Sequence, residues 1–167
     1  MPGARIVLVG EQPGDHEDET GRPFVGPAGR VLERALEAAG LGEVPRYTTN
    51  VVKHFKWEAR GKRRIHQKPN QAEVNACLPW LLGELEAVTP EVVVLLGATA
   101  AQAMLGRAFR VTRQHGQLLT LPSGTAALAT IHPSAVLRAH DGDARDMAFE
   151  GMVRDLTVVA DELLSKS

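Results

Sequence analysis

The sequence has little cysteine, no long apolar run and almost no net charge. Its one cysteine, Cys77, has no partner within the chain for a disulfide, which fits a reducing cytoplasm. No apolar run approaches the roughly 18 residues of a membrane-spanning helix, and the opening MPGARIVLVG is unlike a secretory signal. Hydrophobic residues make up 44% and charged residues 23% of the 167 residues, as in soluble globular proteins. These features predict one domain, residues 1–167, with no membrane partner.

The net charge of −1 conceals a strongly basic segment between residues 53 and 69. Seven of the 19 lysines and arginines fall there with one acid, Glu58, so the segment carries about +6 and the rest of the chain about −7. The basic residues are Lys53, Lys56, Arg60, Lys62, Arg63, Arg64 and Lys68. Three of them stand together just before Ile65 and His66. One basic segment on an otherwise acidic chain indicates an anionic partner that binds at one place.

Four short apolar runs predict four strands, at residues 5–9, 47–52, 92–96 and 126–131. The third, VVVLL, shows no polar alternation, which is expected of a strand buried on both faces of a parallel sheet. Helical patterns lie between and after the runs, at residues 27–39, 70–88 and 98–105, and from about 144 onward. Strands that alternate with helices predict an α/β fold, a three-layer αβα sandwich around a mainly parallel four-stranded sheet.

The unusual segments of the sequence lie at or just after the ends of these predicted strands. A glycine- and proline-rich stretch, Gly10–Gly29, follows the first strand, and Asn50 lies within the second, which the basic segment follows. GATA, residues 97–100, follows the third strand, and HPSAVLR, residues 132–138, follows the fourth. Because ligands bind such sheets at the carboxyl ends of the strands, we expect a site at this edge.

The stretch Gly10–Gly29 has two interpretations, a long surface loop or a glycine-rich phosphate cradle. It matches neither the dinucleotide motif nor the P-loop motif, which disfavours a nucleotide-triphosphate site. Loops of this length are more often functional than not. Phe24 could form a small satellite core or a platform on which a flat base stacks. The loop's acidic side chains fit either a metal site or a solvated surface.

Three further residues have both a structural and a functional interpretation. His132 follows a strand, where a histidine more often packs or caps than catalyses. Asn50 is buried by position and needs hydrogen-bond partners, and its amide can read both a donor and an acceptor on a pyrimidine edge. Cys77 lies on the inward face of its predicted helix, where a buried thiol is normally inert.

Six segments carry a resemblance to a known family: GEQPGDHED (10–18), GRPFVGPAGR (21–30), TNVVKHFK (49–56), GKRRIH (61–66), VVVLLGATAA (92–101) and HPSAVLR (132–138). Together they resemble the uracil-DNA glycosylase superfamily, in particular its X-type (UdgX) branch, whose members crosslink to uracil-containing DNA. The family-4, iron–sulfur branch shares the GE-x-PG loop, GRPFVG, the strand asparagine and HPS. The glutamine of GEQPG and the KRRIH insert resemble the X-type branch specifically.

The resemblance implies a role for each matching residue. Phe24 would stack on a uracil flipped out of the DNA, and Asn50 would bind its polar edge. His132 would donate a hydrogen bond to the uracil oxygen that gains negative charge, and Glu11 and Gln12 would lie beside the sugar. Gly10 and Asp15 would complete the uracil site. The DNA-binding positions would be Lys62, Arg63, Arg64, Ser134, Leu137 and Arg138.

The resemblance also implies a covalent outcome. Cleavage of an N-glycosidic bond builds positive charge on C1′ of the sugar, and His66 would attack this carbon in place of water. The neighbouring cations disfavour the protonated form of the His66 imidazole, which leaves it nucleophilic. Glu11 would orient or deprotonate His66. A stable bond between His66 and C1′ would end the reaction after one turnover.

The sequence has only part of the ligand set that holds the iron–sulfur cluster in the family-4 relatives. His54 and Cys77 match two ligand positions, but no cysteine precedes the first strand, and two ligands cannot hold a four-iron cluster. Either this is a cluster-free version, or an upstream segment has been removed. We expect no cofactor and no metal.

Two alternative functions stay open. One is a multiple-turnover glycosylase that releases free abasic DNA, with His66 merely contacting phosphate. The other is a non-enzymatic module that binds uracil or DNA. For the main hypothesis we expect a monomer in base excision repair that acts on uracil-containing DNA, with single strands preferred. It would work in a bacterial cytoplasm, associated with the nucleoid through DNA.

Overall fold

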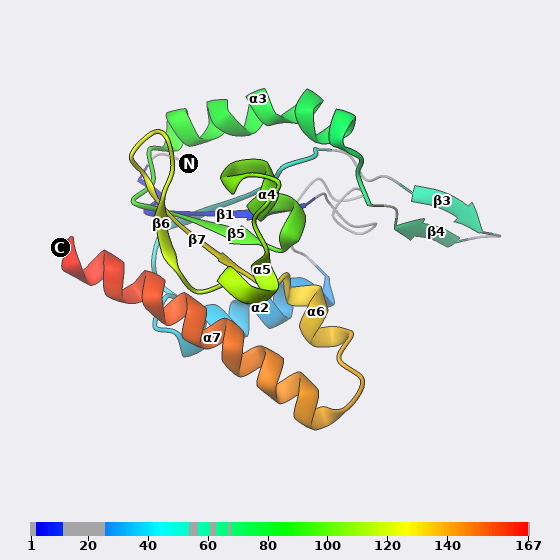
Figure 1. Ribbon diagram of the computed structural model, residues 1–167. Coiled ribbons are helices and arrows are strands. Elements are labelled where there is room, and N and C mark those ends of the chain that lie inside the picture. Colours follow the sequence, from blue (N-terminus) through cyan, green and yellow to red (C-terminus); the bar gives the residue numbers. More distant parts are fainter. Residues whose placement is uncertain (1–2, 12–25, 54–56, 61–62, 67, 167) are drawn as a thin grey trace.

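A computed structural model of the chain shows an open β-sheet between two layers of helices (Figure 1). It describes residues 3–11, 26–53, 57–60, 63–66 and 68–166, with the backbone alone for 57–60 and 63–66. The sheet has the strand order β2-β1-β5-β7-β6. The strands are β1 Ile6–Gly10, β2 Arg46–Asn50, β5 Val92–Leu96, β6 Leu118–Thr120 and β7 Ala126–Thr130. The helices are α2 Pro27–Ala38, α3 Gln71–Val88, α4 Ala98–Leu105, α5 Val111–Gln114, α6 Pro133–Leu137 and α7 Gly142–Ser165.

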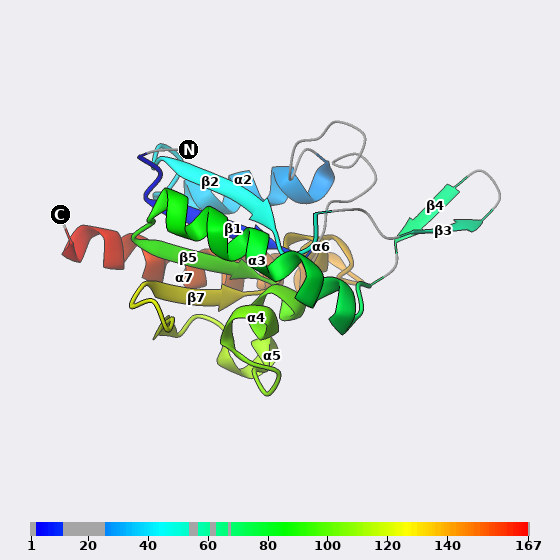
Figure 2. The ribbon, with the colours of Figure 1, turned by 90° about the horizontal axis from the view of Figure 1, so that it is seen from above.

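Different helices cover the two faces of the sheet. Helices α2, α6 and α7 lie on one face and α3 and α4 on the other (Figure 1 and Figure 2). Successive strand residues point to opposite faces, so Leu8 and Val94 pack with the first layer and Val9 and Leu95 with the second. Strands β1, β5 and β7 are buried along their whole length, which explains the unbroken apolar run VVVLL. The predicted three-layer α/β fold is confirmed.

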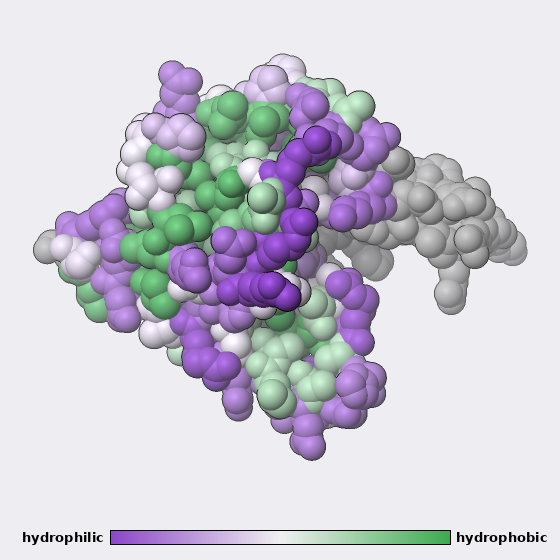
Figure 3. Space-filling model, in the orientation of Figure 1, coloured by the Kyte–Doolittle hydropathy of each residue, from purple (hydrophilic) through white to green (hydrophobic). Residues whose placement is uncertain are grey.

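The sheet has one strand more than the four predicted. Strand β6 is antiparallel to β7 and places Leu118 opposite Leu128, so the sheet is mainly but not wholly parallel. It escaped prediction because three residues are too few for an apolar pattern to stand out. On the face drawn in Figure 3, hydrophobic residues reach the surface along this edge, where Leu118 is 39% exposed. Because β6 is only three residues long, it offers few unpaired backbone groups to a strand of another chain.

The basic segment forms a hairpin and not the loop that its charge suggested. Strand β3 (Trp57–Arg60) pairs antiparallel with β4 (Arg63–His66). The hairpin projects from the edge of the sheet at which β1 and β5 end (Figure 1). Trp57 lies opposite His66 at the end of the ladder away from the turn, so His66 belongs to the root of the hairpin and not to its tip.

The helix ends follow the signals in the sequence. The side chain of Asn70 accepts a hydrogen bond from the Glu73 backbone N–H at 2.9 Å, which confirms the predicted cap of α3. Gly40, with a φ of +83°, follows α2 as predicted. Helix α7 begins at Gly142, slightly earlier than predicted, because Asp141 caps it through the Ala144 N–H at 2.7 Å. Among the described residues, no helix has the length and apolar character that a membrane crossing requires.

Candidate active site at the carboxyl ends of the strands

The strand ends bring residues from distant parts of the sequence to one edge of the sheet. Gly10 at the end of β1 lies opposite Asn50 at the end of β2. The ends of β5 and β7 are joined by a hydrogen bond from the Gly97 N–H to the Thr130 carbonyl oxygen at 2.9 Å. His132 stands two residues beyond β7. The predicted gathering of Gly10, Asn50 and His132 at this edge agrees with the observed topology.

Glu11 is held by both its side chain and its backbone. It follows β1 directly, and its half-buried carboxylate accepts a hydrogen bond from the hydroxyl of Thr99. Thr99 lies in the first turn of α4 and is 9% exposed. The Glu11 carbonyl oxygen accepts from the Val52 N–H at 2.9 Å. The carboxylate is therefore fixed where it can stabilise positive charge. Sequence reasoning did not assign Thr99, whose place in GATA after a buried strand was the one available signal.

Asn50 is buried, yet its amide has no hydrogen-bond partner among the residues that the structure describes. The residue is 8% exposed, and no other described side chain or backbone group donates a hydrogen bond to its amide or accepts one from it. Buried polar groups are nearly always hydrogen-bonded, so such an amide is suited to a ligand that supplies the missing bonds. The amide offers two donors and an acceptor, which suits the polar edge of a pyrimidine.

His132 caps α6 and has a defined tautomer. Its Nδ1 accepts a hydrogen bond from the Ser134 backbone N–H at 3.1 Å, and the Ser134 hydroxyl lies 2.8 Å from the same nitrogen. A backbone N–H can only donate, so Nδ1 carries no proton and the neutral ring has its proton on Nε2. Nε2 is then a hydrogen-bond donor. Arg138 donates to the Ser134 hydroxyl at 2.8 Å, which leaves the hydroxyl proton for Nδ1. The capping and functional interpretations of His132 are thus compatible.

Gly97 allows β5 and the residue after β7 to approach closely. Its φ is +94°, and a Cβ added there would lie 3.1 Å from the Cβ of His132. Both facts favour glycine at this position, because any other side chain would strain the backbone and push against His132. The sequence marked this residue as following a buried strand but gave no sign of its contact with His132.

A cluster under the end of β2 fixes the backbone around Asn50. Glu84 of α3 accepts hydrogen bonds from the hydroxyls of Tyr47 and Thr49 and from the ammonium of Lys53. Lys53 also donates to Thr49 Oγ1 and to the Asn50 carbonyl oxygen, both at 2.6 Å. Lys53 thereby ties the backbone just after β2 to α3. Sequence reasoning missed Glu84, since nothing in a helix pattern identifies its long-range partners.

The cluster shifts the pKa values of its acidic groups in opposite directions. Partial burial of Glu84 by itself would raise the pKa of its carboxyl, but the donors Lys53 and Tyr47 outweigh that effect and hold the pKa below its usual value. The pKa of Tyr47 is raised to about 12, because its hydroxyl donates to the Glu84 carboxylate and its burial adds to the effect. The neutral phenol and the ionised carboxylate therefore stabilise each other.

Tyr47 is the one tyrosine in the sequence, so tyrosinate absorbance reports on it alone. In the folded protein we expect an alkaline titration with a midpoint of about 12, against the ordinary 10.0 in denaturant. Since the folded state favours the neutral phenol, its contribution to stability is complete below pH 10.0 and is lost as the pH rises through about 12. Glu84→Gln should move the native midpoint toward the ordinary value. A native midpoint equal to that in denaturant would contradict the cluster.

Other predicted site residues lie outside the described part of the structure, namely Gln12, Asp15, Phe24, His54 and Lys62. Arg63, Arg64 and His66 belong to β4, of which only the backbone is described. The roles given to all these residues stay predictions. Ser134, Leu137 and Arg138 do lie beside His132, along α6 and at its end. Leu137 is 39% exposed, and Arg138 is also exposed.

The described residues do not fit an iron–sulfur cluster. No three histidine, cysteine, aspartate or glutamate side chains in the described ranges gather as metal ligands. Cys77 is only half-buried on α3, and no second cysteine exists in the sequence to supply the thiolates that such clusters require. We therefore derive no chemical step through a cluster.

The geometry defines an α/β protein in which a carboxylate, a buried amide and an imidazole donor lie at the carboxyl edge of the sheet. The sequence matches the uracil DNA glycosylase superfamily over residues 1–157, and the chain belongs to this family. It is 35% identical to the Type-4 uracil-DNA glycosylase of Thermotoga maritima over 159 residues, 95% of this chain and 79% of that protein. It is 36% identical to the Type-4 uracil-DNA glycosylase of Pyrobaculum aerophilum over 140 residues, 80% of this chain and 68% of that protein.

A third relative is the Type-5 uracil-DNA glycosylase of Pyrobaculum aerophilum, 35% identical over 148 residues, which cover 78% of this chain and 62% of that protein. The superfamily indicated by the six sequence segments is confirmed. Assignment to the X-type branch, which rested on GEQPG and KRRIH, stays a prediction.

Proposed function

We propose that the chain is a uracil-DNA glycosylase that flips uracil out of DNA and excises it. The observation that carries this proposal is the buried Asn50, whose amide has no partner among the described residues. A buried polar group left unpaired costs about 1–3 kcal/mol, and the donor and acceptor on the edge of a uracil would remove that cost. Membership of the superfamily and the names of the relatives support the same substrate.

The residues divide the work of cleavage. As the C1′–N1 bond breaks, its electron pair goes to the uracil ring and the sugar becomes positive at C1′. The Nε2–H of His132 would donate to the uracil oxygen that gains the negative charge. The Glu11 carboxylate, held by Thr99, would stabilise the positive sugar. Phe24 would stack on the flipped base.

We further propose that His66 captures the sugar. A lone pair of its imidazole would bond to C1′, and the proton on its other ring nitrogen would pass to Glu11 or to the departing uracil. The product would be a neutral N-alkyl imidazole with no leaving group as good as uracil, so the reaction would stop after one turnover. In support of this role, His66 lies at the root of the hairpin, which projects from the edge of the sheet where β1 and β5 end.

The test is the stoichiometry of the reaction with an excess of single-stranded DNA that carries one uracil. We expect a protein–DNA adduct that survives boiling in detergent and reaches one DNA per protein. One uracil should be released for each adduct formed. DNA with thymine in place of uracil should give no band.

The other outcomes identify the alternatives. Uracil and free abasic DNA in excess over protein would indicate a multiple-turnover glycosylase and remove the covalent proposal. Salt-sensitive binding without any uracil release, unchanged by Glu11→Gln or His132→Ala, would indicate a binding module. A double-stranded substrate in parallel would test the proposed preference for single strands.

A further inference from the structure

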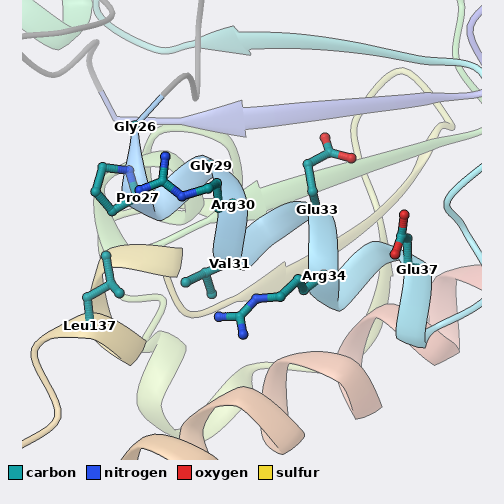
Figure 4. A pocket seen from close by; sticks show the side chains of 9 residues that line it. All are labelled: Gly26, Pro27, Gly29, Arg30, Val31, Glu33, Arg34, Glu37 and Leu137. Carbon is teal, nitrogen blue, oxygen red and sulfur yellow. The ribbon is translucent and has the colours of Figure 1, made fainter.

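A charged groove lies between α2 and α6, next to the candidate active site (Figure 4). Its volume is about 610 Å³, and Arg30 and Arg34 line it from α2 while Leu137 lines it from the end of α6. Figure 4 shows both guanidinium groups toward the end of the groove nearest Gly26 and Leu137, with the Glu33 and Glu37 carboxylates toward the other end. The groove thus has a cationic end and an acidic end.

The two arginines are available for an anionic ligand. Arg30 is exposed, and no carboxylate of a described residue lies within ion-pair distance of it. Arg34 stands over the ring of Phe149, 5.5 Å from its centre, which orients the guanidinium without neutralising its charge. Glu33, between them in sequence, is paired with Arg46 at 2.5 Å. The nearest acid in sequence therefore does not cancel either arginine.

Helix α6 joins the cationic end of the groove to the candidate active site. Leu137 is the last residue of α6, the helix that His132 caps, and Gly26 is the residue before α2. The Cβ atoms of Arg30 and Arg34 are one helical turn apart, about 6 Å. Their long side chains extend in different directions from α2, so each can reach a different phosphate of an extended strand (Figure 4). On the other side of the strand ends, the basic hairpin projects from the sheet (Figure 1). A strand with its target base in the site would then have the two arginines of α2 on one side and the hairpin, basic in sequence, on the other.

We infer that this groove binds the phosphodiester backbone of the DNA strand on one side of the target nucleotide. Arg30 and Arg34 would each neutralise one of two neighbouring phosphates, and the exposed Leu137 would pack against a sugar or base between them and the site. The inference rests on the proposed function for its substrate. Beyond that function, Arg30 and Arg34 become phosphate-binding residues, and the DNA strand leaves the site on the side away from the hairpin.

The test is the salt dependence of DNA binding. The probe is a single-stranded oligonucleotide with a central 2′-fluoro-2′-deoxyuridine, whose electron-withdrawing fluorine opposes positive charge at C1′ and so keeps binding reversible. Each phosphate contact to a single strand contributes about 0.7 to the slope of log affinity against log salt concentration. Arg30→Ala/Arg34→Ala should lower that slope by about 1.4, so that a fourfold rise in salt costs the wild type about sevenfold more affinity than the variant.

Two further variants test whether the salt slope depends on charge at the groove or on the total charge of the protein. Arg30→Lys/Arg34→Lys keeps both charges and should keep the slope. Arg154→Ala/Lys166→Ala removes one exposed charge of α7 and one just after it, neither of which lines the groove, and should also keep the slope. Two further probes carry the fluorinated nucleotide near the 5′ end or near the 3′ end. The alanine variant should lower the salt slope for only one of them, because the groove binds the strand on one side of the target nucleotide. Thermal unfolding checks that each variant is folded.

An unchanged slope in the alanine variant would overturn the inference, as would an equal loss in the α7 variant or in the lysine variant. Because this measurement needs no cleavage, it is independent of the excision experiment. If the alanine variant lowers the slope but the wild-type protein releases no uracil, DNA binding by the groove is supported and the glycosylase proposal is wrong. If the wild-type protein releases uracil but the alanine variant leaves the slope unchanged, only the proposed role of the groove is wrong.

Discussion

Replacement of His66 with alanine is expected to abolish the covalent adduct completely while uracil release continues. In the proposed mechanism, cleavage of the glycosidic bond depends on Asn50, His132 and Glu11, and none of these is altered by the change. Water would then take the position of the imidazole and trap C1′, which frees the enzyme for further turnovers. The band that resists detergent should fall from one per protein to none, and abasic DNA should accumulate beyond the amount of protein.

His140→Ala is the matched control, because His140 is 86% exposed and lies just before α7. It should form the adduct at the wild-type rate. If the His66→Ala protein still gave the band, another residue would be the nucleophile and the X-type assignment would lose its main support. If both adduct and release disappeared, His66 would serve cleavage itself or the folding of the hairpin, which a thermal unfolding curve would distinguish.

Replacement of His132 with alanine should slow uracil release by about a hundredfold to a thousandfold, the usual cost of removing one donor to a developing oxyanion. The hydrogen bonds to Nδ1 from Ser134 keep the proton on Nε2, so the ring can donate without first becoming charged. Since cleavage precedes capture, adduct formation should slow by the same factor. The measurement is a single-turnover rate with enzyme in excess over DNA.

Ser134→Ala provides the comparison within the same contact. It removes the hydroxyl bond to Nδ1 but keeps the backbone N–H at 3.1 Å, so the tautomer should persist and the loss of rate should be much smaller. Equal losses in the two variants would show that the hydroxyl, and not the backbone, orients the ring. A wild-type rate for His132→Ala would eliminate His132 as the donor.

The layers of the fold could be read from the sequence because the buried strands are apolar runs, and β5 and β7 are each followed by a helix after at most two residues. The face of α7 that carries Met152, Leu156 and Val159 was likewise visible in its spacing, and all three are buried. Strand β6 and the hairpin could not be read in this way. One is three residues long, and the other is dominated by charge, so neither shows an apolar period.

The candidate site was predictable only as far as topology determines it. Asn50 and His132 were placed at the sheet edge because parallel strands end there. The bonds that hold the site could not be foreseen, since Thr99 binds Glu11 across 88 residues and Glu84 binds Lys53 across 31. Such partners depend on how helices pack on the sheet. Gly97 is a similar case, because its contact with His132 exists only once β5 and β7 are paired.

The order of the strands has a consequence for the timing of activity during synthesis. Strand β5 lies between β1 and β7, so Glu11 and His132 share an edge only when all three have paired. His66 leaves the ribosome before β5 and β7 do, but the group that activates the uracil belongs to the end of β7. Under the proposed chemistry, a nascent chain carries its nucleophile without the means to create the electrophile. Under this proposal the chain is kept from reacting before β7 has been synthesised and paired.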